Sequence, residues 1–382
     1  MPESIPATGT VHWIGAGLST GSGLRVVCDR ADHVVLWART THKAEDRLTQ
    51  LGLAGHAAAD AFELDSLNAA VKPGDVVVSM LPAAHHIALL RSCISQGAHF
   101  ACSSYVCEPI LDSVPQAEMA GIVVLAEAGL DPGIDHMLAR MLVAAGHAAI
   151  GDAPATAEFT SYCGGLPAVP NDFRYRFSWA PRGVLSALCQ PARYITDGET
   201  KVASHPWEAV RPLTVGSDEF EVYPNRDSIP FAAQYGFPAS WRLETFVRGT
   251  LRLDGWSDAW AGVFAELRAG DEDRIAALAD ELAARYPVTD ADLDRVVLAV
   301  ALSLRPGRGA DWYGEYRIDL TGDQAESAMA RCVSLPLAFG VTEILDGRMA
   351  PGLHQAAQDA EEARRWIDFL AEQGILCASN LA

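Results

Sequence analysis

The feature that most constrains this chain is an alternation, up to about residue 130, of short β-branched runs with segments of helical spacing. The runs are Val11–Ile14, His33–Trp37, Asp75–Met80, Ala98–Cys102 and Gly121–Ala126. Such alternation is typical of a parallel sheet that is covered by helices on both faces. We therefore predict an α/β fold with a doubly wound parallel sheet, and we expect ligands to bind at the edge where the strands end.

The pattern changes after this region. Residues 157–215 mix alternating strands with Gly/Pro turns, and Phe246–Leu253 alternates like a strand with one buried face. An Ala-, Leu- and charge-rich segment follows, which favours helices. The predicted domains are 1–132 for the parallel sheet, 133–256 with 309–322 for a mixed α/β domain, 257–308 for a small helical insertion, and 323–382 for a segment that returns to the first domain, with a helix over Ala325–Leu345 broken near Pro336.

Charge and cysteine usage exclude several classes of protein. Lys plus Arg number 29 against 49 Asp plus Glu, a formal net charge of −20, which disfavours nucleic acid and anionic membranes as partners. None of the 8 cysteines forms CxxC or a zinc pattern, so we expect a reduced, cytoplasmic chain without a metal site. Met1–Thr10 has no signal-peptide pattern, and no uninterrupted run of about 18 apolar residues suggests a membrane span.

A glycine-rich turn follows the first apolar run. Gly15 permits a tight turn, and Gly17 lets the backbone approach a pyrophosphate that the next helix N-terminus stabilises. Leu18 and Ser19 complete the expected contact with a dinucleotide. Thr20 stands at the third glycine position, so the fingerprint is imperfect, and an ordinary turn is the alternative interpretation.

The end of the second run indicates which dinucleotide is bound. An NAD enzyme usually places a carboxylate there for the ribose 2′-hydroxyl. This chain has Arg39, followed by Thr40, Thr41 and Lys43. A guanidinium beside hydroxyl groups suits a 2′-phosphate, so the predicted cofactor is NADP, with an exposed strand-end arginine as the alternative.

Longer motifs resemble one family. They include Cys102–Val106, Glu127–His136 and Ser161–Pro167. The similarity covers nearly the whole chain, with the motifs in the same order. The further matches are Arg176–Trp179, Arg182–Leu185, Tyr223–Ser228 and Val247–Arg252. Together they resemble the saccharopine reductases, the NADP-dependent, glutamate-forming saccharopine dehydrogenases. The resemblance implies an N-terminal Rossmann domain, a mixed α/β substrate and dimerisation domain, a helical insertion and a homodimer.

The resemblance also implies roles for individual residues. Those expected around the substrate are Ser104, Tyr105, Asp131, Cys163, Arg226, Thr250, Leu251 and Arg252. Those expected along the nicotinamide half of the cofactor are Leu81, Pro82, Ser103, Leu130, Pro132 and Trp179. The groups available for proton transfer are Tyr105, Asp131 and Cys163, with water as the alternative.

Physical chemistry supports some of these roles and offers alternatives to others. Saccharopine carries three carboxylates, which Arg226 and Arg252 could grip bidentately. Strand alternation places Arg248, Thr250 and Arg252 on one face, so all three face either the site or solvent. Cys163 could be a small apolar filler and Trp179 a core residue. The histidines at positions 85, 86 and 136 are expected to be cap or core residues rather than metal ligands.

The implied reaction is oxidation of the C–N bond of saccharopine, with hydride passing to the nicotinamide. Water then attacks the imine and releases L-glutamate and α-aminoadipate δ-semialdehyde. Two alternatives stay open. One is a related dehydrogenase for another N-alkyl amine such as carboxynorspermidine, and the other is a dinucleotide-binding sensor without turnover.

Overall fold

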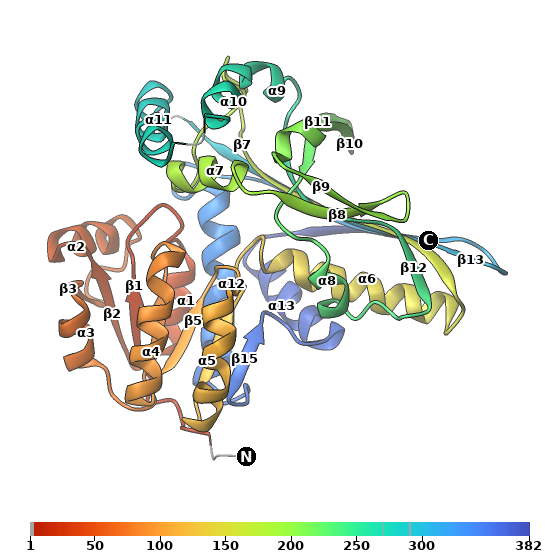
Figure 1. Ribbon diagram of the computed structural model, residues 1–382. Coiled ribbons are helices and arrows are strands. Elements are labelled where there is room, and N and C mark those ends of the chain that lie inside the picture. Colours follow the sequence, from red (N-terminus) through yellow and green to blue (C-terminus); the bar gives the residue numbers. More distant parts are fainter. Residues whose placement is uncertain (1–3, 270, 290–291) are drawn as a thin grey trace. The chain divides into compact units, whose positions relative to one another are not determined.

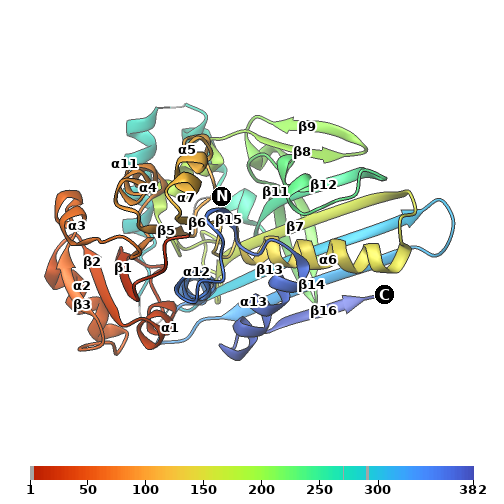
Figure 2. The same ribbon diagram turned by 90° about the horizontal axis from the view of Figure 1, so that it is seen from below.

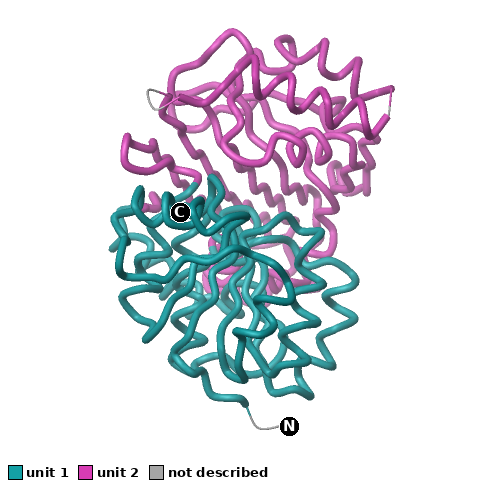
Figure 3. The backbone as a smooth tube through the Cα atoms, turned by 90° about the vertical axis from the view of Figure 1, so that its left-hand side faces the viewer, with its two compact units in different colours: residues 1–137, 330–374 teal, residues 138–329, 375–382 magenta. Residues whose placement is uncertain are grey.

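The computed structural model describes residues 4–269, 271–289 and 292–382, which form two compact units (Figure 3). Unit 1 comprises Met1–Met137 and Ala330–Gly374, and unit 2 comprises Leu138–Met329 and Ile375–Ala382. Residues 1–3 of the predicted first domain, and 270 and 290–291 of the predicted insertion, lie outside the described residues. Each unit has its own sheet and is described by itself.

Unit 1 is built on a sheet that has seven strands among the described residues, all paired in parallel. Their order is β15-β6-β5-β4-β1-β2-β3, so the direction of winding reverses between β1 and β4. That reversal point is where open α/β sheets bind ligands. The strands are β1 (Thr10–Ile14), β2 (His33–Ala38), β3 (Ala58–Ala61), β4 (Val76–Ser79), β5 (His99–Cys102), β6 (Val123–Ala126) and β15 (Gly352–Gln355).

Helices cover both faces of this sheet. In Figure 2, α4 and α5 lie on one face, and α1 and α12 lie on the other. The helices of this part of the chain are α1 (Gly23–Arg30), α2 (Thr41–Gln50), α3 (Leu64–Ala70), the 3₁₀ turn η1 (Ala83–His85), α4 (His86–Gln96), α5 (Glu108–Met119), α12 (Ala328–Leu345) and α13 (Ala360–Glu372). The predicted doubly wound parallel sheet is confirmed, because each buried strand of the sequence pattern is a strand of this sheet.

Helix α12 differs from the prediction because Pro336 does not break it. The residues on both sides, Ser334, Leu335 and Leu337, are fully or almost fully buried, and this packing keeps the helix continuous where a missing N–H would weaken it. Among the described residues, α12 is the one helix long and apolar enough to cross a membrane. Of this helix 72% is buried, as in the core helix of a globular protein.

Unit 2 contains a mixed sheet of nine strands within the described ranges. Seven follow the order β10-β11-β12-β7-β13-β14-β16, and the hairpin β8–β9 pairs with β12 (Figure 1). β12 runs parallel to β7 and antiparallel to β11, so it lies inside the sheet. The strands are β7 (Ala155–Pro167), β8 (Ala192–Thr196), β9 (Glu199–Ala203), β10 (Arg211–Val215), β11 (Asp218–Pro224), β12 (Trp241–Leu253), β13 (Asp294–Pro306), β14 (Trp312–Thr321) and β16 (Cys377–Leu381).

Part of the predicted helical insertion is wrong. The helices end at Arg285, and β13 pairs along its length with β7 on one side and β14 on the other. Because both faces of β13 are largely buried, its Ala- and Leu-rich sequence does not alternate, and a buried strand then reads like a helix. The helices of this unit are α6 (Ile134–Ile150, which begins in unit 1), α7 (Pro181–Leu188), η2 (Pro206–Ala209), α8 (Pro230–Gln234), α9 (Trp256–Ala259), α10 (Ala261–Leu267) and α11 (Glu272–Arg285).

The end of the chain also differs from the prediction. Residues 330–374 belong to unit 1, but β16 pairs antiparallel with β14, so residues 375–382 belong to unit 2 rather than to the first domain. β16 is short and mostly exposed, which gives it a weak sequence signal. Helix α6 packs closely on β13, because a Cβ added at Gly146 of α6 would lie 2.7 Å from Leu304 Cδ1 of β13.

Candidate active site

The glycine-rich turn follows β1 in unit 1, and its first two glycines have different surroundings. Gly15 has φ +116°, and a Cβ added there would lie 3.0 Å from Met80 Cβ, so both conformation and space require glycine. A Cβ added at Gly17 would meet nothing within 4 Å. Leu18 is 57% exposed beside it. The turn therefore presents open backbone at Gly17, as a bound pyrophosphate would need.

The imperfect third position of the fingerprint has a structural role. Thr20 is buried, its Oγ1 donates to Gly15 O at 2.8 Å, and Trp13 Nε1 donates to the same hydroxyl at 3.4 Å. Arg47 of α2 donates through Nε to Thr20 O at 3.1 Å. These bonds hold the turn without a third glycine at position 20.

Sequence reasoning missed Gly23, which takes over the close-packing role of that third glycine. A Cβ there would lie 2.1 Å from Ser334 O of α12, and Gly23 N donates to Ser334 Oγ at 3.1 Å. The signal was present in the sequence, because Gly23 continues the run of spaced glycines that begins at Gly15. Arg47 gave no comparable signal, since its contact with the turn depends on how α2 packs.

Arg39 lies directly after β2 and is exposed. Thr40 is the N-cap of α2, where its side chain accepts a hydrogen bond from Lys43 N at 3.2 Å. The Thr40 hydroxyl is thus already engaged in capping. The exposed guanidinium of Arg39 stands at the strand end where the ribose of a dinucleotide is expected.

Strands β4 and β5 bring several predicted residues to the same edge of the sheet. Leu81 is half-buried and Pro82 exposed after β4, while Ser103 and Ser104 are half-buried after β5. His86, which the sequence analysis assigned to a helix cap or the core, connects these two segments. Its Nδ1 lies 3.0 Å from Ser79 Oγ and its Nε2 lies 2.9 Å from Ser104 Oγ. Burial, and secondarily His85, lowers the pKa of His86 to about 4.

Tyr105 and Asp131 form a direct pair. Tyr105 Oη donates to Asp131 Oδ1 at 2.5 Å, and Asp131 precedes Pro132 through a cis peptide bond. Leu130 and Pro132 are buried on either side. The phenol donates its proton directly to the carboxylate, and a hydrogen bond of this kind is a path along which a proton can move.

Glu127 is a second acidic residue near Tyr105, and the sequence analysis gave it no role of its own. Glu127 is buried with φ +55°, and its carboxylate accepts from Val106 N at 3.1 Å and from Gln355 Nε2 at 2.9 Å. His136 Nε2 lies 3.1 Å from Glu127 Oε2, and its Nδ1 lies 3.3 Å from Asp135 Oδ2. The buried His136 ring therefore lies between the carboxylates of Glu127 and Asp135, in the segment next to Tyr105.

Unit 2 holds the remaining predicted residues, several of them on adjacent strands. Cys163 of β7 is buried and lies opposite Thr250 of β12 in the strand register. The two strands approach closely, because a Cβ added at Gly164 would lie 2.2 Å from Leu251 O. The glycine beside Cys163 therefore has a packing reason, and Leu251 is fully buried in the core.

Arg252 of unit 2 is a buried cation with aromatic rings around it. Its side chain is only 6% exposed, and its Cζ lies 4.8 Å from the ring centre of Tyr175 and 5.6 Å from those of Tyr223 and Trp256. Nη1 donates to Leu251 O at 3.2 Å, while Nε is buried without a partner. Among the residues that the structure describes, no carboxylate forms an ion pair with this guanidinium.

The other cations and the tryptophan have different surroundings. Arg248 is 2% exposed, with its Cζ 4.0 Å from the ring centre of Phe231, so the solvent-facing alternative is wrong for Arg248 and Arg252. Arg226 is exposed and has φ +56°. The half-buried Trp179 packs on Gly183, where a Cβ would lie 2.4 Å from Trp179 Cζ3.

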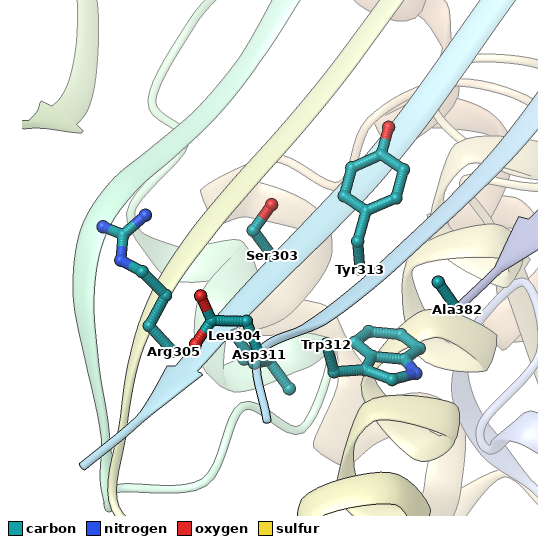
Figure 4. A pocket seen from close by; sticks show the side chains of 7 residues that line it. All are labelled: Ser303, Leu304, Arg305, Asp311, Trp312, Tyr313 and Ala382. Atoms are coloured by element: carbon teal, nitrogen blue, oxygen red, sulfur yellow. The ribbon is translucent and has the colours of Figure 1, made fainter. Parts of the chain in front are cut away.

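A cavity of about 220 Å³ lies in unit 2, at one end of β13 and β14. It is lined by Ser303, Arg305, Trp312 and Tyr313 among others (Figure 4). None of its lining residues is a predicted site residue. Within the described part of the chain, no group of three or more His, Cys, Asp or Glu residues could hold a metal ion.

Comparisons with known proteins agree on one family. Residues 11–125 match the family model of the saccharopine dehydrogenase NADP binding domain, and residues 129–375 match that of the saccharopine dehydrogenase C-terminal domain. The NADP-dependent, L-glutamate-forming saccharopine dehydrogenase of Pyricularia oryzae is 35% identical over 256 residues, which is 65% of this chain and 56% of that protein. The mitochondrial α-aminoadipic semialdehyde synthase of Bos taurus is 37% identical over 222 residues, 56% of this chain and 23% of that protein.

Solved structures extend the similarity over the whole chain. The apo saccharopine dehydrogenase (L-Glu forming) of Saccharomyces cerevisiae has a TM-score of 0.79 at 26% identity, covering 98% of this chain and 99% of that one. The homospermidine synthase of Legionella pneumophila in complex with NAD has a TM-score of 0.67 at 11% identity, covering 100% and 93%, and shares the fold alone. The sequence matches to the Pyricularia and bovine proteins span about half of the former and a quarter of the latter.

Proposed function

The chain belongs to the saccharopine dehydrogenase family, and from that premise we propose that it catalyses the NADP-dependent interconversion of saccharopine with L-glutamate and α-aminoadipate δ-semialdehyde. The NADP binding domain of this family spans residues 11–125. The activity rests on the names of relatives and on the chemistry of the residues described above in each unit.

The observation that carries the proposal is the buried guanidinium of Arg252. A buried cation without an anionic partner costs folding free energy, and a protein retains it where a ligand supplies the missing charge. Saccharopine brings three carboxylates, and a planar fork binds a carboxylate through two parallel hydrogen bonds. The rings of Tyr175, Tyr223 and Trp256 lie around the guanidinium and stabilise its charge through cation–π contacts. Arg226 and Thr250 complete the proposed substrate-binding set in unit 2, together with Leu251, which is proposed to take part through its backbone because its side chain is buried in the core.

NADP, when bound, accepts the hydride from the carbon of the C–N bond and returns it in the reverse direction. In the proposed site, Gly15, Gly17, Leu18 and Ser19 face the pyrophosphate. Arg39 and Thr40 face the 2′-phosphate. The residues proposed along the nicotinamide half are Leu81, Pro82, Ser103, Leu130, Pro132 and Trp179.

Oxidation of the secondary amine leaves an imine, which water attacks to give a carbinolamine that splits into glutamate and the semialdehyde. Each of these steps moves a proton. The Tyr105–Asp131 pair can take up or release one across its 2.5 Å hydrogen bond. We propose this pair as the proton-transfer group, with Ser104 binding the substrate next to it. Cys163 is proposed to line the site, since it pairs with Thr250 in the register of β7 and β12.

The test follows NADPH absorbance in the condensation direction. Rapid loss of NADPH with glutamate plus α-aminoadipate δ-semialdehyde supports the proposal. Loss of NADPH only with diaminopropane and the semialdehyde that pairs with it, and not with glutamate, would indicate the carboxynorspermidine type of activity instead. Binding of NADPH without turnover on either substrate pair would indicate a sensor.

We also propose a location and an oligomeric state for the protein. The cysteine usage favours a location in the reducing cytoplasm, and the family resemblance favours a homodimer. Light scattering coupled to size-exclusion chromatography tests the second, and a monomeric mass at assay concentration would contradict it.

A further inference from the structure

The buried histidine at the start of α4 lies between the ends of two strands and contacts one hydroxyl on each. His86 is 1% exposed, Ser79 is the last residue of β4, and Ser104 follows β5. Nδ1 faces Ser79 Oγ at 3.0 Å, and Nε2 faces Ser104 Oγ at 2.9 Å. Ser104 belongs to the site proposed above, so the inference below rests on that proposal for the identity of the ligand.

His86 is neutral at physiological pH, since burial lowers its pKa to about 4. A neutral imidazole has one N–H donor and one acceptor nitrogen, so only one of the two serines can donate to it. Either Ser79 donates to Nδ1 and Nε2–H donates to Ser104, which leaves the Ser104 hydroxyl proton without an acceptor on His86. Or Ser104 donates to Nε2 and Nδ1–H donates to Ser79, which leaves the Ser79 hydroxyl proton without one.

The surroundings of the two serines distinguish these arrangements. Ser79 is 1% exposed, and within the described residues His86 is the one hydrogen-bond partner of its hydroxyl. If Ser79 did not donate to Nδ1, its proton would be buried without an acceptor, which is costly. Ser104 is half-buried, and its hydroxyl likewise has His86 as its one partner among the described residues. An unused proton on Ser104 can reach water or a ligand.

We propose that His86 holds Ser104 as a hydrogen-bond donor to an oxygen atom of the bound ligand. Ser79 Oγ–H donates to Nδ1, Nε2–H donates to Ser104 Oγ, and the Ser104 hydroxyl then directs its own proton outward. The backbone of Ser104 is fixed as well, because its carbonyl accepts from Glu127 N at 3.0 Å. His86 is thus a positioning residue, and the ligand atom that it selects is a carbonyl or carboxylate oxygen.

Such an oxygen could belong to the substrate or to the carboxamide of the nicotinamide. The chemistry is the same in both, and separate binding measurements distinguish them. Ser104→Ala should raise the dissociation constant of either saccharopine or NADPH about tenfold, while Ser104→Thr, which keeps the hydroxyl, should retain most of the affinity. Ser95→Ala, at an exposed position on α4, is the matched control and should change neither. Unchanged affinity for both ligands in Ser104→Ala would overturn the proposal.

The tautomer itself is read directly by ¹⁵N-detected NMR of ¹⁵N-histidine-labelled, ligand-free protein, with His86 assigned from the signals lost in His86→Gln. The expected result is a protonated Nε2 and an unprotonated Nδ1. In Ser79→Ala, which frees Nδ1, a mixture of the two tautomers is expected. A wild-type His86 protonated at Nδ1 would overturn the proposal. This readout needs neither ligand nor turnover, so an error in the proposed substrate leaves it unaffected.

Discussion

At the scale of single residues, Gly15 and Gly17 of the turn after β1 contribute in opposite ways. Gly15 is required by the fold, because its φ of +116° and its contact with Met80 leave no room for a side chain. Gly17 meets neither condition, and the space above it is empty. In the proposed site the cofactor occupies that space, so the two positions should respond differently to the same substitution.

Gly17→Ala should leave the unfolding free energy of the ligand-free protein within about 0.5 kcal/mol of wild type. The added methyl group should nevertheless raise the NADPH dissociation constant at least about tenfold, because it occupies the approach to the pyrophosphate. Urea unfolding and NADPH fluorescence titration measure the two quantities. Gly15→Ala is the comparison variant and should lose stability as well. Unchanged NADPH affinity in Gly17→Ala would remove the turn from the cofactor site.

Arg39→Asp should weaken NADP binding by about ten- to a hundredfold and spare or improve NAD binding, because a carboxylate repels the 2′-phosphate and accepts from a 2′-hydroxyl. Arg91→Asp, an exposed position on α4, makes the same change in net charge and should alter neither. Titrations with NADP and NAD check this. Equal weakening of both cofactors would mean that Arg39 does not distinguish them.

At the scale of helices and strands, Asp294 of β13 caps the start of α12. The Asp294 carboxylate accepts from Ala328 N at 2.7 Å and from Met329 N at 2.9 Å, so it satisfies two free N–H groups at the helix start. α12 also carries Ser334, which contacts Gly23. Asp294 at the start of β13 thereby stabilises the first turn of α12.

Asp294→Ala should lower the unfolding free energy by about 1–2 kcal/mol, the usual cost of losing a helix N-cap. Asp294→Asn keeps an acceptor oxygen and should lose less than half of that. Urea unfolding followed by far-UV circular dichroism measures both. If Asp294→Ala matched wild type, the capping contact would contribute nothing to stability.

The same elements show what the sequence could predict. Strands β1, β2, β4, β5 and β6 were predicted with small shifts of their ends, because a buried parallel strand between helices has a clear pattern. β13 was taken for a helix because its pairing with β7 and β14, not its local sequence, decides its conformation. Which face of β12 is buried was left open for the same reason, so the burial of Arg248 and Arg252 required the structure.

Side-chain networks were the least predictable part of the candidate site. Glu127 and His86 stood in recognised segments of the sequence, but their partners come from other strands and helices. Only tertiary packing brings Gln355 to Glu127 or Ser104 to His86. By contrast, the glycine-rich turn after β1 could be predicted from the sequence, because its conformational demands are local and are met by glycine.

At the scale of the whole molecule, protonation couples to stability through three buried histidines of unit 1. Burial lowers the pKa values of His12, His86 and His99, in the case of His86 to about 4. Below pH 6.5 the unfolded chain therefore binds protons that the folded chain refuses. Stability is unaffected by these groups above that pH and falls as pH drops toward 4.

His86 alone should remove about 2 kcal/mol of unfolding free energy between pH 7 and pH 5. Urea unfolding at the two pH values should show this loss in wild type and a smaller one in His86→Gln. His56→Gln, at an exposed position, is the control and should keep the wild-type pH dependence. An unchanged pH dependence in His86→Gln would mean that His86 is protonated equally in both states.

The central claim is that the buried guanidinium of Arg252 is completed by a carboxylate of the substrate. Calorimetric titration of saccharopine into the protein loaded with NADPH, compared with Arg252→Met, tests it most directly. The account predicts that saccharopine affinity in the variant falls at least about thirtyfold while NADPH affinity stays, and that the ligand-free variant unfolds at the same temperature as wild type or higher, since a buried unpaired charge is gone. Wild-type saccharopine affinity in Arg252→Met would contradict it.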